Sequence, residues 1–106
     1  MLENRKYPRY DKDLEVRYST VGLTAIESES VTQNVSQSGI RFHVSRLIKA
    51  GDALNLLINS PGKGESPIRA SGKVVWTRES GKFDVEAGLA FTKIDSRDAS
   101  RLVTVA

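Results

Sequence analysis

The sequence predicts an all-β fold of about six antiparallel strands, followed by one short C-terminal helix. Three observations predict it. Short runs of alternating apolar and polar residues recur along most of the chain, turn-forming residues separate these runs, and apolar residues take a helical spacing only near the C-terminus. A sheet of this size must cover its apolar face, so the strands form a barrel or a closely packed sandwich. With 106 residues, the chain is one domain with a single core.

The expected strands differ in how clearly they are patterned. Apolar and charged residues alternate over residues 14–18, the second strand is weakly patterned, and the last has the most regular alternation. The fifth strand places Trp76 on the same face as Ala70 and Val74, which favours a core position; stacking on a base is the alternative. In order, the strands are expected over residues 14–18, 24–33, 40–45, 53–58, 68–78 and 83–91.

Turns separate these strands. The segment 60–67 contains two prolines and two glycines, which cannot continue a ladder. Shorter turns are expected at residues 21–22, 51–52 and 79–82.

The C-terminal segment has the features of a helix. Asp95 followed three residues later by Asp98 resembles a capping box, with Asp in place of the usual Glu or Gln. Apolar residues then follow at intervals of three and four, which predicts an amphipathic helix of about three turns against the barrel. These residues are Ala99, Leu102, Val103 and Ala106.

Composition excludes several classes of protein. The net charge of +3 is well short of a nucleic-acid-binding arm. The chain has no cysteine, which excludes disulfides and thiolate sites, and its one histidine has no set of partners that would build a metal site or a catalytic triad. No apolar stretch is long enough to insert directly into a membrane, and no export signal is present, so a cytoplasmic location is the default.

The first candidate motif is a pair of arginines four residues apart. Arg5 and Arg9 lie in the one clearly basic segment of the chain, and Pro8 disfavours a helix there. Residues 1–12 are therefore expected to be a mobile arm, and residues 13–106 the barrel with its helix. The arginine fork matches phosphate oxygens and the O6 and N7 acceptors of guanine. The alternative is a pair of solvated charges on a loose terminus.

The second candidate motif is Asn34-Val35-Ser36-Gln37-Ser38-Gly39. If the segment is extended, Asn34 and Ser36 point to one face, where an amide and a hydroxyl suit a base edge and a phosphate. Gly39 allows a positive φ or a close backbone approach. The alternative is an Asx or Ser turn between two strands.

Together the two motifs resemble the signature of the PilZ domain, a bacterial receptor module for the second messenger cyclic di-GMP. The resemblance extends from about residue 4 to the C-terminal helix and includes Gly51, residues 72–76 and residues 87–91. It implies a six-stranded PilZ-type barrel without enzymatic activity.

The resemblance also implies a binding site and a mode of signalling. Arg5 and Arg9 are expected to bind guanine and phosphate, Asn34 and Ser36 to contact the other guanine and an adjacent phosphate, and Gly39 to let the backbone approach the ligand. Asn34 stands where Asp is frequent in the family, and an amide offers one acceptor where a carboxylate offers two. No cofactor is expected besides this ligand. The arm is expected to reorder on binding and to signal to a partner protein or a fused domain.

Two other functions stay open. The domain could be a PilZ-type protein-interaction module that does not bind nucleotide, although the intact motifs count against it. A single-stranded nucleic-acid barrel would need aromatic residues interleaved with cations, and only the tyrosines near the arm come close, so no nucleic-acid partner is expected.

Overall fold

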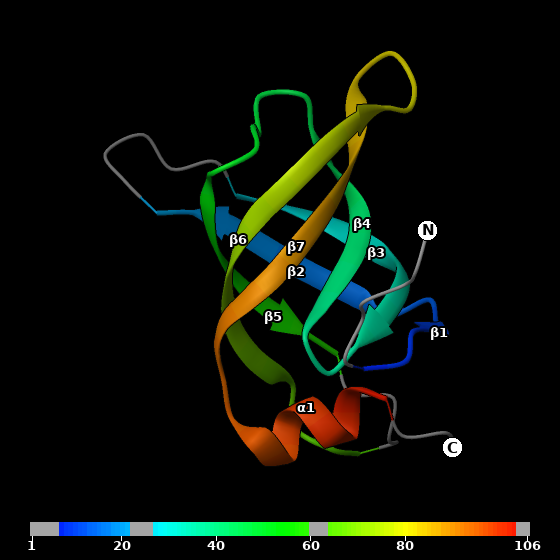
Figure 1. Ribbon diagram of the computed structural model, residues 1–106, viewed down its shortest axis with the longest axis vertical. Helices are drawn as coiled ribbons and strands as arrows, with labels where there is room; N and C mark the ends of the chain where they lie inside the picture. The colour runs from blue at the N-terminus through cyan, green and yellow to red at the C-terminus, as the bar shows by residue number, and fades with distance from the viewer. Residues whose placement is uncertain (1–6, 22–26, 60–63, 104–106) are drawn as a thin grey trace.

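The computed structural model describes residues 7–21, 27–59 and 64–103, and it confirms the predicted barrel with one C-terminal helix (Figure 1). The elements are β1 (Tyr10–Asp11), β2 (Glu15–Thr20), β3 (Glu27–Ser36), β4 (Gly39–Ser45), β5 (Ala53–Ile58), β6 (Ile68–Glu79), β7 (Asp84–Ile94) and α1 (Ser96–Leu102).

The six long strands close into a barrel. They follow the order β3-β2-β5-β6-β7-β4, and the pairing of β3 with β4 joins the two ends of the sheet. Every neighbouring pair is antiparallel, as in the long hairpin of β6 and β7 that crosses the front of the barrel in Figure 1. The two-residue strand β1 adds to β3 outside this ring. Closure leaves few unpaired strand edges, which stabilises a small β domain.

Side chains that alternate along the strands fill the core, as the sequence pattern predicts. On β4, for example, Ile40, Phe42 and Val44 are buried, and the ring of Tyr18 meets that of Phe42 edge to face at 5.6 Å. The hydroxyl of Tyr18 accepts a hydrogen bond from the backbone N–H of Ser45 at 2.9 Å, so its one polar atom is paired.

The helix α1 lies across one end of the barrel (Figure 1). The Asp95 carboxylate accepts from the N–H of Arg97 at 2.8 Å, so Asp95 is the N-cap of the helix. Asp98, the second residue of the predicted capping box, accepts from Arg101 at 2.8 Å, so the structure shows only the N-cap half of that prediction. Ala99 and Leu102 are buried. The helix is shorter than the predicted three turns, because Val103 already caps its end. Ala106 lies outside the described residues.

Two sequence predictions about aromatic residues are wrong. Trp76 was expected in the core, but it lies on the outer face and is 39% exposed. Val74 pairs with Leu89 while Trp76 pairs with Gly88, so Val75 is an extra residue on β6, and this bulge turns Trp76 outward. Phe83 was expected as a strand residue, but it precedes β7 and is 86% exposed in the turn.

Candidate functional site

The arm joins the barrel at a break between β1 and β2. Both strands run along the same edge of β3, and Thr32 of β3 bridges the interruption. Its hydroxyl accepts from the N–H of Leu14 at 2.9 Å and donates to the carbonyl of Lys12 at 2.6 Å. Its own N–H donates to the carbonyl of Leu14 at 2.8 Å. Sequence reasoning missed Thr32, because only the register shows that it lies opposite the break.

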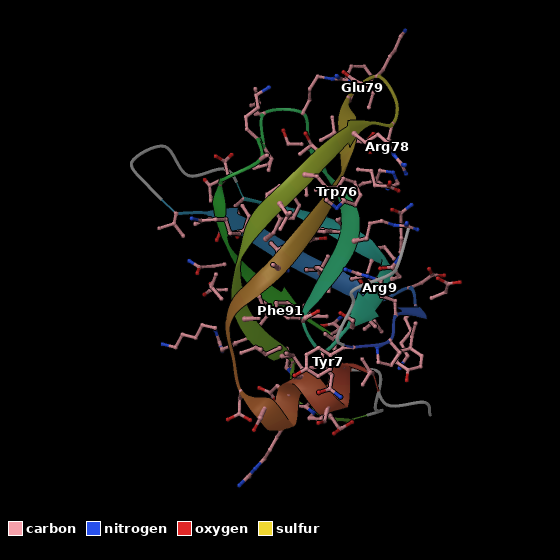
Figure 2. All side chains as sticks on the ribbon, in the orientation of Figure 1. Tyr7, Arg9, Trp76, Arg78, Glu79 and Phe91 are labelled. Carbon is pink, nitrogen blue, oxygen red and sulfur yellow. The ribbon has the colours of Figure 1, made fainter. Side chains whose placement is uncertain are left out.

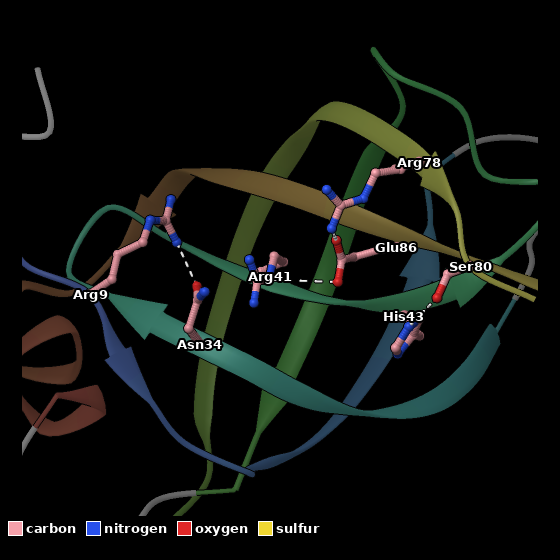
Figure 3. Close-up of polar contacts among 7 residues, drawn as sticks. All are labelled: Arg9, Asn34, Arg41, His43, Arg78, Ser80 and Glu86. Carbon is pink, nitrogen blue, oxygen red and sulfur yellow. Dashed lines mark hydrogen bonds and ion pairs between the residues drawn. The ribbon is translucent and has the colours of Figure 1, made fainter. Parts of the chain in front are cut away.

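The break places the arm over the second motif. Nη1 of Arg9 donates to Oδ1 of Asn34 at 2.9 Å, across 25 residues of sequence (Figure 3). Asn34 is only 7% exposed and is the cross-strand partner of Asp11 in β1. The structure therefore brings together the two predicted motifs at Arg9 and Asn34. Arg5 lies outside the described residues.

Ser36 forms a local turn at the end of β3. Its hydroxyl accepts from the N–H of Ser38 at 3.2 Å, lies 3.0 Å from the Ser38 hydroxyl, and is 3.4 Å from the carbonyl of Gly39. Ser36 is also fully buried. The Ser turn, the alternative reading of this motif, is thus present, and Ser36 supports the segment that carries Asn34. A contact between Ser36 and a ligand stays a prediction.

Gly39 is required by a close approach of two backbones. A Cβ at this position would lie 2.0 Å from the carbonyl oxygen of Leu89 on β7, so no other residue fits without a backbone shift. Its φ is not positive, which leaves close approach as the reason for glycine. The approach is to β7, and a role of Gly39 toward a ligand stays a prediction.

The outer face beyond Asn34 is rich in charged and aromatic groups. Glu86 on β7 forms ion pairs with Arg41 and Arg78, and Arg78 also lies over the Trp76 ring, 5.8 Å from its centroid. His43 shares a hydrogen bond of 2.8 Å with Ser80 nearby (Figure 3). Figure 2 shows Trp76 and Arg78 on β6, near the hairpin end of the barrel, and Arg9 lower on the molecule. Neither Arg41 nor Glu86 belongs to a sequence motif. Glu86, however, is an acidic residue inside the apolar run of β7, and that position is a signal of function that the sequence does contain.

This arrangement can bind an anion with a flat polar base. It presents guanidinium donors and an amide on one face, which suit phosphate oxygens and a purine edge. Over the described residues, no group of three or more His, Asp or Glu side chains is placed to hold a metal ion. No helix in the described ranges has the length and apolar character needed to span a membrane.

Comparison with solved structures shows the fold. Bacillus subtilis MotI/DgrA, an inhibitor of motility, superposes with a TM-score of 0.75 at 21% identity, over 95% of this chain and 48% of that one. The PilZ domain of Escherichia coli YcgR, solved with c-di-GMP, gives a TM-score of 0.72 at 11% identity, over 95% of this chain and 89% of that one. The K. pneumoniae MrkH–c-di-GMP complex gives a TM-score of 0.62 at 11% identity, over 95% of this chain and 50% of that one. The chain thus spans about half the length of MotI/DgrA and of MrkH.

The sequence comparisons identify the family. No match was found among the curated proteins searched. The PilZ domain family, in contrast, matches residues 3–105, which is nearly the whole chain. PilZ domains are receptor domains without catalytic activity, which agrees with the prediction that the protein is not an enzyme. The protein belongs to the PilZ domain family.

Proposed function

We propose that this domain is a cyclic di-GMP receptor, and that its site comprises Arg5, Arg9, Asn34, Ser36 and Gly39. The observation that supports it most is the hydrogen bond from Arg9 to Asn34, because it joins the two motifs on one face of the barrel. The PilZ domain of YcgR and MrkH, which share the fold, were both solved with c-di-GMP.

The chemistry of the two joined residues suits this ligand. Arg9 offers a planar fork that pairs with guanine O6 and N7 or with a phosphate. Asn34 offers an amide acceptor for a guanine N–H donor. Because Asn34 is nearly buried and its Oδ1 already accepts from Arg9, a ligand donor must share this acceptor with Arg9 or displace the Arg9 guanidinium. Binding is therefore coupled to the position of the arm.

This coupling provides an output. The arm, residues 1–12, re-forms over the bound dinucleotide and changes the surface that a partner protein or a fused domain meets. The barrel and its helix, which lie within residues 13–106, serve as the platform. We place this signalling in the cytoplasm of a bacterium.

Trp76 is a candidate for base stacking. Its outward placement favours the alternative that the sequence left open, because the ring is accessible on the face that carries Arg41. A stacked guanine would quench the emission of this single tryptophan.

Isothermal titration calorimetry with cyclic di-GMP tests the proposal, with GTP and cyclic di-AMP as controls. We expect a micromolar or tighter Kd, about −8 kcal/mol or stronger. Absence of binding by a folded domain would overturn it.

That negative result would favour the second candidate, a PilZ-type protein-interaction domain that does not bind nucleotide. Phe83 and Leu47 favour this candidate, because both are large apolar side chains exposed to solvent.

A further inference from the structure

The outer face beside Asn34 carries a further arginine that lies outside both motifs. Arg41 on β4 is the cross-strand partner of Asn34 on β3. Its neighbours Ile40 and Phe42 are fully buried, so alternation along β4 directs Arg41 outward, to the side where Arg9 meets Asn34. Cross-strand partners on one face have Cβ atoms about 4.5–5.5 Å apart. Arg41 therefore adjoins the proposed binding site.

Glu86 is the buried carboxylate of this face, and two arginines share it unequally. Its side chain is 8% exposed. Arg78 donates a hydrogen bond to Oε1, whereas Nε of Arg41 lies 3.7 Å from Oε2, beyond hydrogen-bond distance (Figure 3). That Nε is buried and has no hydrogen-bond partner within the described part of the chain. Arg41 is thus the loosely held partner of Glu86.

We propose that Arg41 is a third ligand-binding arginine, which contacts a phosphate of cyclic di-GMP, and that Glu86 weakens this contact by competing for the same guanidinium. The inference rests on the function proposed above and adds a phosphate subsite to it. Nε is a donor that lacks an acceptor, and a phosphate oxygen supplies one. The Arg41 side chain is 36% exposed, so a ligand on the outer face can reach it.

Arg78 makes this exchange of partners feasible. A buried carboxylate that loses its only counter-charge is strongly destabilising. When Arg41 turns to a phosphate, Glu86 keeps its hydrogen bond from Arg78 and stays paired. The remaining effect of Glu86 is to attract Arg41 back and to repel the phosphates, and both effects lower affinity.

Calorimetric titration with cyclic di-GMP of Arg41→Gln, Glu86→Gln and the double variant tests the inference. Arg41→Gln should weaken binding about tenfold, the loss of one charge-assisted hydrogen bond. Glu86→Gln should tighten it, and this gain should vanish in the Arg41→Gln background, because Glu86 acts through Arg41. Glu29→Gln is the matched control. Glu29 forms an ion pair with its cross-strand partner Arg17 at the far end of β3. The substitution removes the same charge as Glu86→Gln and should leave the Kd unchanged.

The outcomes separate this inference from the proposed function. An unchanged Kd for Arg41→Gln, with binding weakened by Arg9→Ala, would overturn the role of Arg41 and leave the receptor function in place. A gain from Glu86→Gln that persists without Arg41, or that Glu29→Gln reproduces, would overturn the role of Glu86. Absence of binding by the wild-type domain would overturn the proposed function itself. If Arg41→Gln does not fold, Arg41→Lys keeps the charge, removes the fork, and should still weaken binding.

Discussion

The indole of Trp76 covers Gly88 on the outer face of the barrel. A Cβ on Gly88 would lie 2.3 Å from Nε1 of the indole and 2.4 Å from Cε2. The two residues are cross-strand partners because the bulge at Val75 turns Trp76 away from the core. Gly88 is also the cross-strand partner of Arg41 on β4, so β7 alone separates the single tryptophan of the chain from Arg41.

Gly88→Ala should lift the indole off β7. Because the ring lies at the surface and can move, we expect a modest loss of stability, about 1 kcal/mol. Emission of Trp76 should shift to longer wavelength as the ring becomes more exposed, and fluorescence together with thermal unfolding would measure both effects. Lys93→Ala, an exposed change elsewhere on β7, should alter neither. An unchanged spectrum for Gly88→Ala would mean that the indole does not pack on Gly88.

Gly39→Ala should destabilise the domain more than Gly88→Ala does. The added methyl group meets the backbone carbonyl of Leu89, which cannot move unless β4 and β7 separate. We expect the free energy of unfolding to fall by about 3 kcal/mol or more, the upper end of the range for overpacking. Chemical denaturation of the two variants side by side would rank them. Equal losses would mean that the backbones at Gly39 separate easily.

Alternation in the sequence predicts most of the fold but not the exceptions to it. The core residues of β2, β4 and β5 follow directly from period-two alternation. Trp76 does not, because one extra residue in a strand reverses the face of everything after it, and no local pattern marks the bulge. Phe83 continues the alternation of β7 but lies in the turn, since the pattern does not fix where the hairpin ends.

The site is predictable only in part for a related reason. The family resemblance identified Arg9 and Asn34 as site residues, and in the structure these two residues are hydrogen-bonded. Thr32, Arg41 and Glu86 belong to no motif, and their relation to the site depends on register between strands that are distant in sequence. Register follows from barrel closure, which a single sequence does not specify.

Arg9→Ala should separate binding from stability. It removes a donor for guanine or phosphate, so the affinity for cyclic di-GMP should fall about tenfold or more. The free domain loses only one partly buried hydrogen bond, so its stability should fall by about 1 kcal/mol. Calorimetry and thermal unfolding give the two values. Arg17→Ala, at an exposed ion pair with Glu29, is the control and should leave the affinity unchanged. An unaltered Kd for both Arg5→Ala and Arg9→Ala would remove the arm from the proposed site.

Cyclic di-GMP should slow hydrogen exchange at the arm. The backbone of Tyr10 and Asp11 pairs with β3 over only two residues, so we expect these amides to exchange fast in the free domain. Contacts between Arg9 and the ligand should then protect them, while amides in the long β6–β7 hairpin stay protected in both states. Hydrogen exchange measured by NMR with and without the dinucleotide resolves the two regions. Equal protection of the arm in both states would refute the coupling of binding to arm order.

Substitutions at Asn34 should reveal what the amide recognises. Asn34→Asp supplies a second acceptor for the guanine N1–H and N2–H donors, and Arg9, 2.9 Å from Oδ1, is close enough to offset the added charge, so cyclic di-GMP should bind more tightly. Asn34→Ala should weaken binding by about 1–3 kcal/mol, the usual size of a contact to a base edge. Cyclic di-AMP lacks these guanine donors and O6, and it should bind the wild-type domain far more weakly in the same titrations. Similar affinities for the two dinucleotides would mean that the site recognises phosphates alone, and Asn34 would then have no part in selecting the base.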